Sequence, residues 1–143
     1  MDTSYFAVSD RKKWRKKAEN YLVLNINSNG EHFFDAILDQ AQSALKNGVD
    51  TLYYVPISQG HDNDLKYYQR LIKAGIPEDK LQLLDRASDF KHFLSILANA
   101  KKVIGTRLHL FLVSSFLGVP VQTFPYQKKI LKMQKVLQHY HID

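Results

Sequence analysis

The chain has 143 residues, of which 45% are hydrophobic and 24% charged, and its formal net charge is +6 at pH 7. This length and composition are typical of one globular domain and argue against a disordered chain. The chain has no cysteine, which excludes disulfide scaffolds and thiolate metal sites. We expect a cytoplasmic protein, with membrane association left open, because no apolar run is long enough to span a bilayer and no signal peptide is visible at residues 1–10.

The positive charge is unevenly distributed along the chain. Residues 11–17 alone supply six positive charges, and residues 128–135 contain four lysines. Such clusters can bind nucleic acid, anionic lipid or acidic substrates, although a solvated helix or a linker is the more common role. We therefore predict a basic leader or linker at residues 1–19, a single domain at residues 20–143, and no nucleic-acid partner.

Short apolar runs alternate with amphipathic helical patterns from residue 21 onward. The predicted strands are 21–27, 51–56, 81–84, 103–104 and 119–124. The predicted helices lie at 34–45, 65–72 and 90–97, from about residue 106, and in a basic segment at the end of the chain. This alternation predicts βαβ units and hence an α/β fold: a doubly wound parallel sheet of about five strands in a Rossmann-like three-layer sandwich.

Ligands of such sheets bind beyond the carboxyl ends of the strands. The corresponding segments here are 25–30, 56–64, 85–86, 105–109 and 124–129. Neither a GxGxxG nor a GxxxxGK[ST] motif is present, and the six histidines lack metal-ligand spacing. We therefore expect no metal site and no dinucleotide cofactor.

Arg107 and His109 stand out because they follow a buried strand and are predicted to lie in the first turn of a helix. A cation there opposes the helix dipole, which suggests that an anion is nearby. A guanidinium can bind a phosphate or carboxylate with two parallel hydrogen bonds. The alternative is a salt bridge from Arg107 to Asp85 or Asp62, with His109 packed in the core.

Asp64 lies in the polar loop before the predicted helix 65–72. Helix capping by Asp62 or Asp64 explains this loop without any functional role, since aspartate is among the best capping residues. Orientation of a sugar hydroxyl, or pairing with Arg107, is the other possibility. Both stay open from the sequence alone.

Three motifs of the C-terminal third resemble the signature of the polysaccharide pyruvyl transferase family. They are VIGTRLH at residues 103–109, GVP at 118–120, and Tyr126 followed three positions later by Lys129. The resemblance implies one half of a GT-B-like fold that binds the donor phosphoenolpyruvate, without a cofactor. It also implies transfer of the donor's enolpyruvyl group to a saccharide as a ketal, in cell-surface polysaccharide biosynthesis.

The same resemblance assigns roles to individual residues. Arg107, Leu108, Tyr126 and Lys129 would bind the donor, and His109 would be the catalytic acid or base. Asp64 is also predicted to bind substrate. The acceptor side would come from a second Rossmann-like domain or subunit, so this domain alone is expected to be an incomplete transferase. Two other functions are considered: the donor-binding half of a GT-B glycosyltransferase that uses a nucleotide sugar, and a non-catalytic basic binding module.

Overall fold

A computed structural model describes residues 15, 17–56, 64–84 and 90–123, without the side chains of residues 28–30, 108 and 109. The five strands are β1 (Tyr21–Asn25), β2 (Thr51–Tyr54), β3 (Leu81–Leu83), β4 (Lys102–Gly105) and β5 (Val121–Thr123). The α-helices in these stretches are α3 (Phe34–Lys46), α4 (Leu65–Lys73), α5 (Phe90–Ala98) and α6 (Leu108–Phe116). Two 3₁₀ helices, η1 (Ser28–Phe33) and η2 (Glu78–Lys80), complete the described elements.

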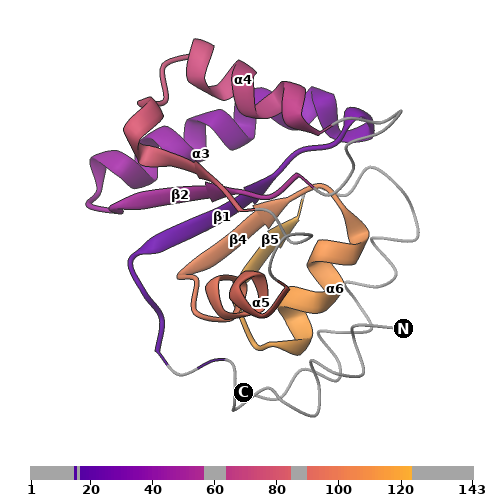
Figure 1. Ribbon diagram of the computed structural model, residues 1–143. Coiled ribbons are helices and arrows are strands. Elements are labelled where there is room, and N and C mark those ends of the chain that lie inside the picture. Colours follow the sequence, from indigo (N-terminus) through magenta and orange to yellow (C-terminus); the bar gives the residue numbers. More distant parts are fainter. Residues whose placement is uncertain (1–14, 16, 57–63, 85–89, 124–143) are drawn as a thin grey trace.

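The five strands form one parallel sheet in the order β3-β2-β1-β4-β5. The chain builds the sheet outward from β1 to β3, then returns to the centre and adds β4 on the other side of β1 (Figure 1). This confirms the predicted doubly wound, Rossmann-like fold. The direction of winding reverses between β1 and β4, and such a reversal is the usual ligand site of an open α/β sheet.

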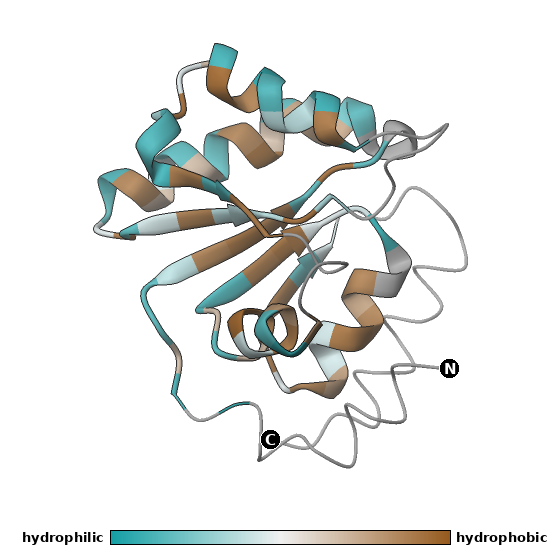
Figure 2. Ribbon diagram, in the orientation of Figure 1, coloured by the Kyte–Doolittle hydropathy of each residue, from teal (hydrophilic) through white to brown (hydrophobic). Residues whose placement is uncertain are grey.

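Helices cover both faces of the sheet, α3 and α4 on one side and α5 and α6 on the other (Figure 1). Leu22 and Leu24 of β1 pack in the α3–α4 cluster, whereas Val23 between them packs in the α5–α6 cluster. Because the strand is buried on both faces, its residues before Asn25 form a continuous apolar run rather than an alternating pattern. The helices turn their apolar sides toward the sheet (Figure 2).

Element boundaries differ from the predicted ones at a few positions. The first strand ends at Asn25 rather than residue 27, and the last begins at Val121 rather than residue 119. Pro120 has no N–H to donate to a ladder, although its carbonyl oxygen still accepts from Val103 N at 2.9 Å. After α4 the chain turns at Gly75, whose φ of +117° is readily adopted only by glycine.

The start of α6 corrects the prediction for Arg107. The helix begins at Leu108, and Arg107 precedes it as the N-cap residue with extended dihedral angles, φ −90° and ψ 130°. The guanidinium is therefore carried by backbone outside the first helical turn. The predicted helix at the end of the chain and the predicted segment 85–86 lie outside the described residues.

Arg15 attaches the segment before β1 to the end of α5. Its Nη1 donates to the carbonyl oxygens of Ala98 at 2.7 Å and Ala100 at 3.2 Å. A cation at a helix C-terminus satisfies otherwise unpaired carbonyls and is favoured by the helix dipole. The assignment of residues 1–19 as a leader or linker stays a prediction.

Arg15→Ala should lower the free energy of unfolding by about 1 kcal/mol, the typical net contribution of such hydrogen bonds. Urea unfolding measures the change. Lys17→Ala is the matched control, because Lys17 is exposed and donates to Asn99 Oδ1 through its backbone N, which the substitution keeps. Equal stability of Arg15→Ala and the unmodified chain would contradict this role.

Within the described residues, no helix has the length and apolar character needed to cross a membrane.

Candidate functional site

The candidate site lies where the carboxyl ends of β1 and β4 meet, because Asn25 pairs in register with Gly105. Beyond this pair, Asn27 N donates to Thr106 Oγ1 at 2.9 Å, and Thr106 Oγ1 donates to Asn27 Oδ1 at 2.8 Å. A Cβ at Gly105 would lie 3.3 Å from the Asn25 carbonyl oxygen, so a larger residue would crowd the two strands. The two strand ends are therefore held together closely at the winding reversal.

Arg107 forms a bidentate ion pair with Asp64 at this edge of the sheet. Arg107 Nε donates to Asp64 Oδ2 at 3.0 Å, and Nη2 donates to Oδ1 at 2.8 Å. The Asp64 side chain is 0% exposed and that of Arg107 is 20% exposed. Bidentate arginine–carboxylate pairs are among the strongest and most directional hydrogen-bonded contacts in proteins.

This geometry decides between the alternatives for Asp64. Asp64 directly precedes α4, but its carboxylate makes no capping hydrogen bond to that helix. Side-chain capping by Asp64 is therefore wrong, and pairing with Arg107 is what the structure shows. Asp62 and Asp85, the other predicted partners of Arg107, lie outside the described residues.

Asn25 holds the Asp64 carboxylate from the strand side. Asn25 Nδ2 donates to Asp64 Oδ2 at 2.9 Å and to the Val55 carbonyl oxygen at 2.7 Å. The opposite orientation of the amide would set its oxygen against two acceptors, so the hydrogen-bond pattern fixes the assignment. Asn25 Oδ1 is buried and has no hydrogen-bond partner in the described structure.

Tyr54 holds the backbone of Asp64. Its hydroxyl donates to the Asp64 carbonyl oxygen at 2.7 Å and lies 3.0 Å from the Ile26 carbonyl oxygen. Burial, assisted by the nearby Asp64 charge, raises the pKa of the Tyr54 hydroxyl far above its usual value. The hydroxyl therefore remains a hydrogen-bond donor throughout the physiological pH range.

Only part of the predicted site falls within the described structure. Asp64 and Arg107 are brought together, Leu108 and His109 open α6 with side chains that are not described, and Tyr126 and Lys129 lie outside the described residues. Sequence reasoning missed the roles of Asn25 and Tyr54. The sequence feature that could have indicated these roles is a polar group within or at the end of an otherwise apolar strand.

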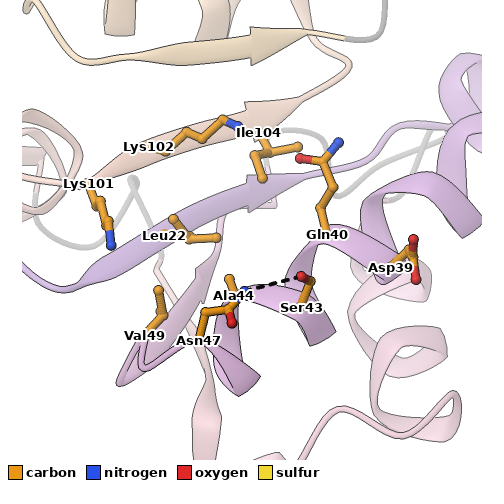
Figure 3. Close-up of a pocket in the computed structure, with 10 residues that line it drawn as sticks. All are labelled: Leu22, Asp39, Gln40, Ser43, Ala44, Asn47, Val49, Lys101, Lys102 and Ile104. Atoms are coloured by element: carbon orange, nitrogen blue, oxygen red, sulfur yellow. Dashed lines mark hydrogen bonds between the residues drawn. The ribbon is translucent and has the colours of Figure 1, made fainter.

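A separate pocket of about 480 Å³ lies between α3 and the neighbouring strands β1 and β4 (Figure 3). Asp39, Gln40 and Ser43 of α3 line one side of it, and Leu22, Lys102 and Ile104 of the sheet line the other. None of the predicted site residues lines this pocket. In the described stretches, no three histidine, aspartate or glutamate side chains gather in a way that could hold a metal ion.

Comparison with known proteins gives one positive result. The family model described as polysaccharide pyruvyl transferase matches residues 4–128, which is most of the chain. Searches of curated proteins and of solved structures gave no significant match.

Proposed function

Because this chain belongs to the polysaccharide pyruvyl transferase family, we propose that it binds phosphoenolpyruvate and acts in the transfer of its enolpyruvyl group to a saccharide. The observation that supports this proposal most directly is the Asp64–Arg107 pair at the winding reversal. It presents a fixed guanidinium beside the N-terminus of α6, whose first-turn N–H groups lack partners within the helix. Anions are favoured at such a position.

The donor's chemistry matches these groups. Phosphoenolpyruvate carries a phosphate and a carboxylate on the same carbon, so its site needs several donors that converge on a small volume. Arg107 and the α6 N-terminus would bind one of the two anions. Lys129, which follows β5 in the sequence, would supply a second cation, and Tyr126 and Leu108 would complete the wall of the site.

Ketal formation needs a proton donor and a base. One sugar hydroxyl adds to C2 of the donor while a proton is delivered to C3, which turns the methylene into a methyl group. A second hydroxyl then bonds to C2 as the C2–O bond to phosphate breaks. Phosphate leaves with the electron pair of that bond and takes up the proton of the second hydroxyl. His109 would deliver the first proton and accept a hydroxyl proton, because imidazole titrates near neutral pH.

We also propose that the acceptor side comes from a second Rossmann-like domain or subunit. The described sheet offers one winding reversal, and Arg107 and Asp64 occupy it. A facing domain would hold the saccharide against the donor and exclude water from the reacting carbon. That second domain, rather than this one, would determine which cell-surface polysaccharide is modified.

Arg107→Lys should weaken phosphoenolpyruvate binding by at least about 10-fold, since loss of one charge-assisted hydrogen bond costs about 1.5–3 kcal/mol. Lysine keeps the charge but loses the planar fork. Isothermal titration of the full chain with phosphoenolpyruvate measures the affinity. The matched control is Arg70→Lys, which changes the arginine of an exposed ion pair with Glu31.

The same titration with UDP separates this function from that of a nucleotide-sugar glycosyltransferase. Binding of phosphoenolpyruvate, but not of UDP, supports the proposal. Unchanged phosphoenolpyruvate affinity in Arg107→Lys would remove Arg107 from the donor site. Binding of UDP, without binding of phosphoenolpyruvate, would instead support the donor-binding half of a nucleotide-sugar glycosyltransferase.

A further inference from the structure

We propose that Asp64 is a positioning residue, which holds the Arg107 guanidinium with one defined edge toward the donor, and that Asn25 in turn holds Asp64. This inference rests on the proposed function, because it concerns how Arg107 meets phosphoenolpyruvate. It assigns to Asp64 a role different from direct substrate binding, which is what the sequence predicted.

The contacts divide the guanidinium into two edges. Nε and Nη2 both donate to Asp64. An anion that binds Arg107 while this pair is intact must use the other edge, formed by Nη1 and Nη2. Since the guanidinium is planar, its direction toward the anion is set by the plane of the Asp64 carboxylate.

Burial argues that the pair stays intact when a donor binds. The Asp64 side chain is 0% exposed, so withdrawal of Arg107 would take the guanidinium away from a carboxylate that water does not reach. Asn25 Nδ2 and the Tyr54 hydroxyl hold the carboxylate and the backbone of Asp64, respectively. Residues of β1 and β2 thus hold Asp64, the residue before α4, and Asp64 holds the Arg107 side chain.

The Asp64–Arg107 pair is close to neutral as a unit, which limits the net positive charge that it offers to the donor. Arg107 contributes direction more than net positive charge, because Asp64 compensates its charge at 2.8 Å. If Asp64 served only to weaken the local positive potential, its removal would strengthen anion binding. If it serves to orient Arg107, its removal weakens binding, so the two roles predict opposite signs.

Asp64→Asn is the first test, because asparagine has nearly the same shape and lacks the charge. We expect phosphoenolpyruvate affinity to fall by about 10- to 100-fold, as happens when a residue that orients a metal ligand is removed. Glu31→Gln is the matched control, since it removes the carboxylate of the exposed Arg70–Glu31 pair. Affinity that is unchanged or higher in Asp64→Asn overturns the proposal.

A second measurement is made on the unmodified chain, and a variant is needed only to assign the signal. In ¹⁵N-labelled chain, the Arg107 Nε–H signal should be resolved and slow to exchange, because this group donates to a fully buried carboxylate. Arg107→Lys identifies the signal by its loss. Persistence of the signal on saturation with phosphoenolpyruvate supports the proposal, and collapse to the position of solvent-exposed arginines overturns it.

The two proposals fail in different ways. Absence of phosphoenolpyruvate binding by the unmodified chain would overturn both of them. Binding that Arg107→Lys weakens and Asp64→Asn does not would leave the proposed function standing and would overturn the positioning role alone.

Discussion

Replacement of Arg107 by methionine should lower the free energy of unfolding by about 3 kcal/mol, at the lower end of the range for breaking a buried ion pair from one side. Methionine keeps much of the apolar stem of arginine but removes the charge. The residue left behind, Asp64, is 0% exposed, and its carboxylate would lose two of its hydrogen bonds. The lower end applies because Arg107 itself is 20% exposed.

A second substitution should restore part of this loss. The double variant Arg107→Met with Asp64→Asn contains no buried carboxylate that has lost its guanidinium partner, so it should be more stable than Arg107→Met alone. Chemical unfolding of the four members of this cycle gives the coupling energy between the two residues. Glu31→Gln breaks an exposed pair, with 43% and 59% of its side chains accessible, and should cost less than about 1 kcal/mol.

The cycle has a clear contrary outcome. If Arg107→Met costs no more than Glu31→Gln, the ion pair contributes little to stability. In that case the Asp64 carboxylate is accommodated without Arg107, and burial would not keep the pair intact when a donor binds.

Leu24→Ala should lower the free energy of unfolding by about 2–5 kcal/mol, the range for buried leucines. Leu24 lies in the central strand β1, is 0% exposed, and packs in the cluster beneath α3 and α4. Against a total stability of about 5–15 kcal/mol, this loss would leave a substantial unfolded fraction at physiological temperature.

Leu83→Ala is the matched control for Leu24→Ala. Leu83 is also a strand leucine, but it lies on the edge strand β3 and is 47% exposed. Its substitution should change stability by no more than about 0.5 kcal/mol, the range for exposed positions. Urea unfolding of both variants measures the difference, and equal costs would contradict the burial assigned to β1.

The fold could be predicted from the sequence because its strands are buried on both faces. Segments such as 21–24 are continuous apolar runs, and the helices between the strands carry apolar residues at helical spacing. Parallel strands need crossover connections, so alternation of the two patterns leaves few other topologies. Strand ends were less predictable, because Ile26 and Asn27 are buried although they lie beyond the end of β1.

The site was predicted only in part, for a physical reason. Arg107 was recognisable because a charged residue interrupts an apolar pattern at a strand end. Asn25 and Tyr54 were not, because one amide in a strand, or one tyrosine, has the same pattern whether it packs in a core or supports a site. Their roles come from their contacts with Asp64, which lies 39 positions from Asn25.

The hydrogen bonds between Asn27 and Thr106 join residues that are 79 positions apart. The loop that they close contains β2, β3 and β4 and the helices α3, α4 and α5, so these bonds offset the entropy of closing it only after most of the sheet has formed. A folding intermediate made of the first three strands would consequently have no donor site. Under the proposed function, ligand binding would be coupled to the last stage of folding. Phosphoenolpyruvate would then protect the chain both against global unfolding and against a partial opening that separates β4 from β1.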